Sequence, residues 1–140
     1  VRALYEASQA GVQIDLIVRG ACTLKPGLPG VSENITVRSV VGRFLEHHRV
    51  WWFGNDGAPD LFCSSADWLE RNLLRRVETA FPILAPHCVQ RVHREGLLNY
   101  LEDNQNAWQL DADGRYRKCA PADGEAPFAA QLSLLEDLYA

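Results

Sequence analysis

The sequence lacks several features that would assign it to a specialised class of protein. No apolar run approaches the roughly 20 residues that a transmembrane helix needs, and the N-terminus lacks the basic-then-apolar layout of a secretory signal. Repeats and low-complexity tracts are also absent. The cysteines have no CxxC or histidine-rich spacing, which predicts neither a zinc site nor a disulfide framework but free thiols at Cys22, Cys63, Cys88 and Cys119. The chain has 140 residues, about the size of one domain, and we therefore expect one globular, cytoplasmic domain spanning 1–140.

The net negative charge narrows the possible functions further. The chain carries 14 Lys and Arg against 18 Asp and Glu, a formal net charge of −4, which argues against a general nucleic-acid binder. The distribution is uneven, because residues 1–76 hold nine basic and eight acidic residues, whereas residues 77–140 hold five and ten. Any anion-binding site is therefore expected in the first part.

Apolar patterning predicts a mixed α/β domain. A helix at 1–11 that stops at Gly11 is followed by a strand at 12–20, whose near-continuous apolar run predicts burial on both faces. Because this is half of a βαβ unit, we expect the domain to be truncated at its N-terminal side. Further strands are expected at 35–42, 49–54, 60–65 and 77–83, with a small hairpin within 108–119. Further helices are expected at 65–76, 86–104 and 128–139.

Local signals refine three of these segments. Asn55-Asp56-Gly57 is a hairpin turn signal between two strands. Ser65 or Asp67 is expected near the N-cap of the following helix. The segment 77–83 is expected to be a final core strand that Pro82 stops.

Three stretches end apolar strands with polar groups, which is where open α/β sheets place their ligands. Arg19 closes the first, and its guanidinium suits a phosphate because it has five fixed donors and stays charged. In the second, His47 can act as a general acid or base. The spacing His47-x-Arg49 places both side chains on one face of an extended segment, where they offer proton transfer and charge neutralisation to one phosphoryl group.

More ordinary interpretations exist for these residues. A lone surface arginine is more often paired with a carboxylate, and a lone histidine is more often structural or merely exposed. His87 and His93 are assigned to that class. His48 would point to the opposite face from His47, so only one of the two can face the site.

The third stretch combines hydroxyls with basic residues. Ser64 and Ser65 end a strand and Asp67 begins a helix, where free backbone N–H groups suit an anion. Arg71 and Asn72 follow on the same predicted helix, and we give a functional and a structural role there equal weight. An N-capped helix with a basic last turn accounts for Arg75 and Arg76 without any ligand.

Several longer motifs occur in a fixed order along the chain. They are "ALYEASQAGVQIDLIVRG", "LPGVSENITVRSVVGRFLEHHRV" and "SADWLERNLLRRVETAFPI", followed by "LEDN", "DGRY" and "PFAAQ". In order and spacing they closely resemble the C-terminal catalytic domain of the bacterial polyphosphate kinases of the first type, over essentially the whole chain. His48, where a small residue is common, and Ser64, where glycine is usual, depart from that pattern.

The resemblance implies a fold and an activity. The fold is a phospholipase D-like α/β/α sandwich with a mixed sheet, whose catalytic signature is His-x-Lys. The activity is reversible transfer of the γ-phosphoryl group of ATP to inorganic polyphosphate, through a phosphohistidine on an upstream domain. By position, His47 is implied as catalytic and phosphate-binding and Arg19 as a ligand of nucleotide phosphates, while Arg49 and Arg71 are expected to help clamp the phosphates. Mg²⁺ is implied, with ligands mostly outside this chain, and no metal ligand is assigned here.

The implied partners and two alternatives complete the expectation. The implied small-molecule partners are ATP or ADP and inorganic polyphosphate. The implied protein partners are upstream domains and further copies of the chain, and no nucleic acid is expected. Peripheral attachment at the inner membrane face is an alternative to a purely cytoplasmic location. A phospholipase D-like phosphodiesterase would use His47 as its nucleophile, although such enzymes generally pair two His-x-Lys motifs. A non-catalytic fragment would only bind polyanion or dock onto neighbouring domains, because the phosphate-accepting histidine has no counterpart here.

Overall fold

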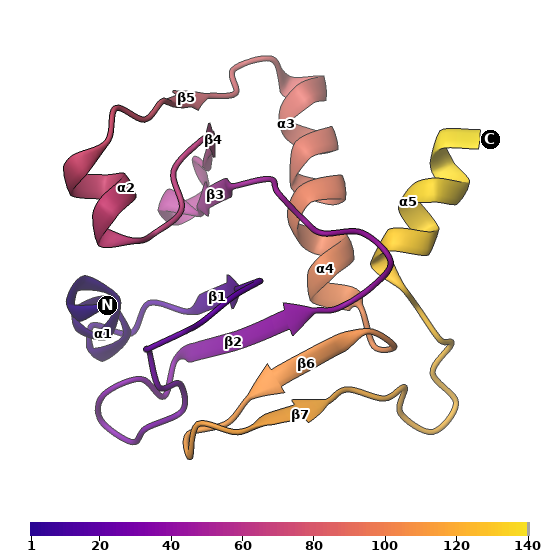
Figure 1. The fold of residues 1–140 in the computed structure, drawn as a ribbon, viewed down its shortest axis with the longest axis horizontal. Helices are drawn as coiled ribbons and strands as arrows, with labels where there is room; N and C mark the ends of the chain where they lie inside the picture. Colours follow the sequence, from indigo (N-terminus) through magenta and orange to yellow (C-terminus); the bar gives the residue numbers. More distant parts are fainter. Residues whose placement is uncertain (140) are drawn as a thin grey trace. The chain divides into compact units, whose positions relative to one another are not determined.

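The computed structural model describes residues 1–139, and the chain divides into two compact units (Figure 1). Unit one comprises Val1–Leu45 and Tyr100–Ala140, and unit two comprises Glu46–Asn99. Each unit contains its own β-sheet.

Unit one is built on a four-stranded mixed sheet with the order β1-β2-β6-β7 (Figure 1). Strand β1 pairs in parallel with β2, whereas the β2–β6 and β6–β7 pairs are antiparallel. The four strands are β1 (Ile14–Ile17), β2 (Ile35–Val40), β6 (Ala107–Leu110) and β7 (Tyr116–Lys118). The mixed α/β class expected from the sequence, including the small hairpin within 108–119, is confirmed.

The first helix and strand of unit one illustrate one success and one correction. Helix α1 (Arg2–Gln9) ends just before Gly11, which has a φ of +89° that glycine adopts without strain. The expectation that the strand after it is buried on both faces is wrong. Strand β1 lies at an end of the strand order and its Asp15 is exposed, where the carboxylate accepts a hydrogen bond from Thr36 on β2.

The interior of unit one combines apolar clusters with one buried carboxylate. Apolar side chains pack around β2 and β6 in two clusters, one with Leu24, Ile35, Val37 and Leu110 and one with Val40, Tyr100, Ala107 and Ala130. Asp103 is 2% exposed, and its two oxygens accept hydrogen bonds from the backbone N–H groups of Gln105, Asn106, Ala107 and Ala130. One side chain thus fixes both the start of β6 and the start of the closing helix α5 (Ala130–Tyr139).

Unit two contains a three-stranded antiparallel sheet, β3-β4-β5. Its strands are β3 (Val50–Phe53), β4 (Asp60–Ser64) and β5 (Ala80–Pro82). A short 3₁₀ turn η1 (Asn55–Gly57) joins β3 to β4 with positive φ at all three residues, so the Asn-Asp-Gly turn signal is confirmed. The aromatic run after Arg49 is therefore strand, as expected.

Two expectations about the segment after β4 are wrong. Helix α2 (Glu70–Arg75) begins after Leu69 with no side-chain cap, so neither Ser65 nor Asp67 caps it. The reason is that Asp67 pairs with an arginine and Ser65 with a glutamate, as described below. The segment at 77–83 is not a core strand, because β5 is exposed along its whole length at the end of the sheet.

The expected helix at 86–104 forms in three pieces. They are α3 (Pro86–His93), the π-helical turn η2 (Arg94–Leu98) and α4 (Asn99–Glu102). Gly96 lies within the π turn, where a Cβ atom would come within 3.2 Å of Val50 Cγ2. The absence of a side chain lets this turn approach the first residue of β3.

Candidate functional site

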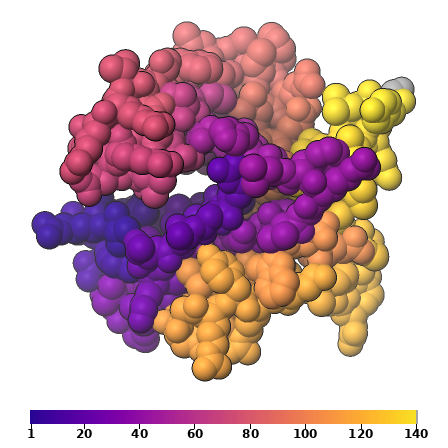
Figure 2. Space-filling view, viewed as in Figure 1, coloured from indigo at the N-terminus to yellow at the C-terminus, as the bar shows by residue number. Residues whose placement is uncertain are grey.

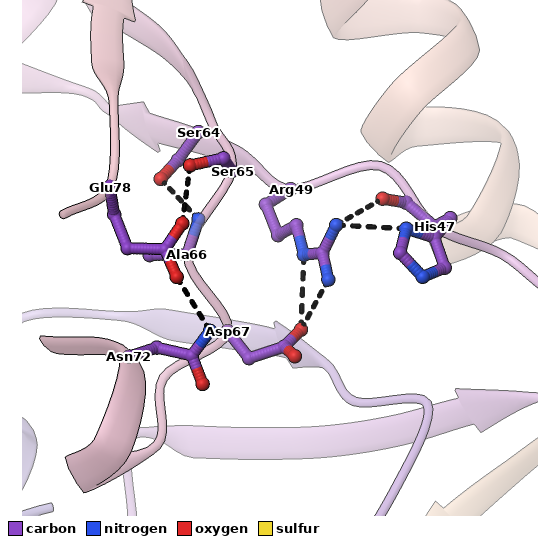
Figure 3. Close-up of polar contacts among 8 residues, drawn as sticks. All are labelled: His47, Arg49, Ser64, Ser65, Ala66, Asp67, Asn72 and Glu78. Carbon is purple, nitrogen blue, oxygen red and sulfur yellow. Dashed lines mark hydrogen bonds and ion pairs between the residues drawn. The ribbon is translucent and has the colours of Figure 1, made fainter. Parts of the chain in front are cut away.

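The His47-x-Arg49 pair lies immediately before β3 in unit two. The Nη1 atom of Arg49 donates to the carbonyl oxygen of His47 over 2.8 Å and lies 2.9 Å from Nδ1 of the His47 ring (Figure 3). The two side chains therefore contact each other. Because a guanidinium can only donate, Nδ1 is the acceptor, and a neutral His47 ring carries its proton on Nε2.

Asp67 holds the other edge of the Arg49 guanidinium. Its Oδ1 atom accepts from Nε over 3.0 Å and from Nη2 over 2.8 Å. The side chains of Arg49 and Asp67 are 19% and 33% exposed, so this ion pair is screened less than one that stands fully in water. We refer to these three residues as the His47–Arg49–Asp67 cluster (Figure 3).

A second polar network lies on the other side of the loop 64–67. Ser65 Oγ donates to Glu78 Oε2, and Asn72 Nδ2 donates to Glu78 Oε1 over 2.8 Å (Figure 3). Ser65 Oγ also accepts a hydrogen bond from the backbone N–H of Thr79. The hydrogen bonds from Ser65 and then Asn72 lower the pKa of Glu78 below its ordinary value, and the charges of Arg76 and Arg49 act in the same direction. Glu78 is therefore a carboxylate at neutral pH.

These contacts correct the expected anion site at the start of the helix. The Ser64 hydroxyl accepts from the backbone N–H of Ala66 over 3.0 Å, and the Ser65 hydroxyl is engaged with Glu78 and Thr79. Both hydroxyls thus stabilise the loop itself. Helix α2 has only six residues, too few for a strong helix dipole at its N-terminus.

The histidines separate into different roles. His48 Nε2 lies 3.0 Å from the carbonyl oxygen of Gly96, and its Nδ1 lies 3.4 Å from Glu46 Oε2, so His48 has partners different from those of His47. His93 stacks on Trp52 with ring centroids 3.9 Å apart, and burial lowers the pKa of His93. His93 is therefore structural, as expected, and the exposed His87 has its Nε2 atom 3.2 Å from Sγ of its neighbour Cys88.

An open cavity of about 290 Å³ adjoins the cluster within unit two. It is lined by His48, Arg49, Val50, Cys63, Ser64, Ser65, Thr79 and Phe81. Burial raises the pKa of the Cys63 thiol, so this cysteine stays protonated at neutral pH and is a poor nucleophile. The remaining polar contribution to the wall comes from Arg49, His48 and the loop hydroxyls.

The other predicted basic residues come from other segments of the chain. Arg19 is exposed in a bend two residues after β1 and belongs to unit one. Arg71 is exposed on α2, and within residues 1–139 no hydrogen bond joins it to the cluster. Arg75 lies in the last turn of α2, as expected, and pairs with Glu70 over 2.9 Å.

The described residues contain neither a cluster of metal ligands nor a helix that could span a membrane. Among residues 1–139, His, Cys, Asp and Glu side chains form no group of three or more that could hold a metal ion. The donor set of these described residues does not by itself fit a magnesium site. Within the same residues, the helices are too short or too polar to span a bilayer.

Sequence reasoning missed two of the residues that organise the site. The local pattern places Ser65 or Asp67 near a helix N-cap and Glu78 within a core strand, whereas Asp67 binds Arg49 and Glu78 binds Ser65. A carboxylate inside an expected core strand is itself a signal, since such a group is rarely buried without a partner. That signal could have pointed to Glu78.

Comparison with known proteins gives one consistent family. The family model described as "Polyphosphate kinase C-terminal domain 2" matches residues 1–131. A polyphosphate kinase of Xylella fastidiosa strain Temecula1 is 67% identical over 138 residues, which is 99% of this chain and 20% of that protein. A polyphosphate kinase of Burkholderia multivorans is 61% identical over 135 residues, covering 96% of this chain and 19% of that protein.

A solved structure supports the same relationship. The crystal structure of polyphosphate kinase from Porphyromonas gingivalis superposes with a TM-score of 0.91 at 43% sequence identity, covering 97% of this chain and 20% of that one. The chain thus spans about a fifth of the length of the relatives that it matches. The fold expected from the resemblance is confirmed.

Proposed function

The chain belongs to the polyphosphate kinase C-terminal domain family, and from this premise we propose that it forms a phosphate-binding part of an ATP:polyphosphate phosphotransferase. In this proposal the enzyme reversibly transfers the γ-phosphoryl group of ATP to inorganic polyphosphate. The phosphohistidine that carries the group belongs to an upstream domain. The observation that supports a role for this chain is the His47-x-Arg49 contact at the position of the signature histidine.

His47 is proposed as the catalytic residue of this chain. With Nδ1 accepting from Arg49, the neutral ring presents an N–H at Nε2, which can donate a hydrogen bond or a proton to a phosphoryl oxygen. Phosphoryl transfer depends mainly on positioning and on stabilising the negative charge of the transferring group. A fixed imidazole N–H and nearby cations supply both.

The three arginines are proposed to contribute to phosphate binding to different extents. Arg19 is exposed, and its guanidinium can bind nucleotide phosphates in the bidentate manner that arginine favours. Arg71 is also exposed and is proposed as a weaker contributor. Arg49 has five N–H donors and makes four contacts to His47 and Asp67, so any phosphate that it binds shares the guanidinium with these partners.

Exposed apolar side chains support contacts with further protein. In unit two they include Trp68, Leu73, Leu74, Val77 and Leu84, and residues 68–84 reach the surface in the pink part of Figure 2. An apolar surface of this kind is typical of an interaction site. We propose that upstream domains and further copies of the chain are the partners that bind it.

The remaining parts of the proposal concern the reaction conditions and the location. The enzyme requires ATP and Mg²⁺, and it is cytoplasmic or peripheral at the inner membrane face.

Substitution in the full-length kinase tests the proposed function. His47→Ala and Arg19→Ala should each lower polyphosphate synthesis from ATP by about 100-fold or more, because each removes a group that contacts transferring phosphates. His87→Ala and Arg75→Ala are matched controls, since both residues lie on exposed helical surfaces of unit two. Near-normal synthesis by either site variant would refute its assignment, and hydrolysis of a generic phosphodiester by the wild type would favour the phosphodiesterase instead.

A further inference from the structure

The contacts of Asp67 go beyond what the proposed function requires. Two donors of one guanidinium edge, Nε and Nη2, meet the same Oδ1 atom of Asp67. This fixes the plane of the guanidinium, and the remaining terminal nitrogen, Nη1, then lies against Nδ1 and the carbonyl oxygen of His47. The orientation of the His47 ring is thereby linked to the carboxylate of a residue 20 positions later in the chain.

We propose that Asp67 is a positioning residue for phosphoryl transfer, whose carboxylate holds Arg49 so that Arg49 keeps the His47 ring in place with Nε2 available to the phosphoryl groups. This inference rests on the proposed function of the chain. Asp67 itself need not contact the substrate. It acts through Arg49, in the way that outer partners orient a catalytic imidazole in other enzymes.

The loop that carries Asp67 is itself held on both sides. The backbone N–H of Ser64 donates to the carbonyl oxygen of Arg49 over 2.9 Å, which aligns the loop with the start of β3. Ser65 is tied to the 78–79 segment by its hydroxyl contacts and by a bond from its N–H to the carbonyl oxygen of Thr79 over 2.9 Å. Glu78 and Thr79 therefore restrict the movement of the Asp67 backbone, and the Asp67 side chain transmits this restriction to Arg49.

An ordinary ion pair on the surface has a different geometry. Glu70 and Arg75 form such a pair on α2, with one contact of 2.9 Å between side chains that are 74% and 68% exposed. Pairs of that kind contribute little to stability. The Arg49–Asp67 pair has two contacts and is half-buried, and its guanidinium also contacts the imidazole of His47. It therefore orients a neighbouring side chain, which the Glu70–Arg75 pair does not do.

The test uses the full-length kinase and measures polyphosphate synthesis as kcat and KM for ATP. Asp67→Ala should lower kcat by about 10- to 100-fold with little change in KM, because misplacing a reacting group by a small distance has effects of this size. Asp67→Asn keeps an oxygen at the Oδ1 position and should retain more activity than Asp67→Ala. Glu70→Ala is the matched control and should leave kcat unchanged.

Coupling to Arg49 separates positioning from stability. In an Arg49→Ala background, Asp67→Ala should lower kcat by no more than about 2-fold further, since its effect passes through the missing guanidinium. A full additional loss in that background, or an unchanged kcat in Asp67→Ala, would overturn the proposal. If Asp67→Ala does not fold, the same comparison is made with Asp67→Asn, whose kcat must then depend on Arg49.

The outcomes also distinguish the two proposals. A wild-type enzyme that makes no polyphosphate would contradict the proposed function. A wild-type enzyme that makes polyphosphate and loses it with His47→Ala, but not with Asp67→Ala, would leave the function in place and contradict only the role of Asp67. Dependence of the Asp67 effect on Arg49 supports both.

Discussion

The two units of this chain use their polar and apolar residues in opposite ways. In unit one, apolar clusters surround the sheet, and the buried Asp103 has both oxygens occupied by backbone N–H groups. In unit two, which lies wholly within the described residues, Leu61 and Ala66 are the only fully buried hydrophobic residues. Its carboxylates Asp67 and Glu78 instead bind side chains at or near the surface.

The difference indicates that the buried carboxylate of unit one stabilises the fold, whereas the carboxylates of unit two orient groups of the candidate site. A carboxylate surrounded by backbone donors fixes chain connections and has no capacity left for a ligand. A carboxylate that orders an arginine beside an exposed histidine holds functional groups in place while leaving them accessible. Unit two thus carries the candidate site on a small core, and three experiments can test this contrast.

The largest effect is expected for the buried carboxylate of unit one. Asp103→Ala removes the acceptor of four backbone N–H groups and should lower the free energy of unfolding by about 3 kcal/mol or more, because buried donors would lose their partners. Asp103→Asn keeps one oxygen acceptor and should cost less. Denaturant unfolding measures both, and faster hydrogen exchange at the amides of Ala107 and Ala130 should accompany the loss. A neutral Asp103→Ala would remove the contrast between the two units.

A comparable loss of stability, but a more selective loss of activity, is expected when buried leucines of the two cores are truncated. Leu61→Ala in unit two and Leu110→Ala in unit one remove the same atoms from buried positions, and each should cost about 2–5 kcal/mol. Below the unfolding temperature of both variants, Leu61→Ala should lower kcat more, because β4 leads directly into the loop that carries Asp67. Equal losses of kcat would mean that unit two does not depend on its own small core.

The smallest effect is a pH dependence that originates at Glu78. Since its pKa is lower in the folded protein than in the unfolded chain, its carboxylate stabilises the fold above the unfolded pKa, and this contribution is lost as the pH falls through the folded pKa. Wild type should therefore exceed Glu78→Gln in stability near neutral pH, and the difference should shrink below about pH 4. Thermal unfolding of both proteins across this range measures it. A difference that grows on acidification would contradict the assigned hydrogen bonds.

Much of the fold could be predicted because local patterns and tertiary packing agree. The Asn55-Asp56-Gly57 turn adopts the left-handed conformations that its residue types favour, and the helix after Pro86 begins at the proline. The contact between His47 and Arg49 likewise joins residues only two positions apart. In each case the deciding interactions lie within a few residues of one another.

The errors arise where distant residues compete for the same group. Asp67 has the residue type and position of a helix cap, but a guanidinium 18 residues earlier binds its carboxylate. Residues 80–82 have an apolar sequence like a core strand, but they form the exposed last strand of a three-stranded sheet. Neither outcome is visible in a local pattern, because each depends on which segments pair across the fold.

The sequence by itself determined the family, the mixed α/β class and the residue types that can handle phosphate, because these depend on the order of motifs and on side-chain chemistry. The tertiary structure decided which of those side chains meet. It joined Asp67 to Arg49 and Arg49 to His47, and it engaged the Ser65 hydroxyl with Glu78. The physical reason is that hydrogen bonds act over about 3 Å, so partners far apart in sequence become partners only when the chain has folded.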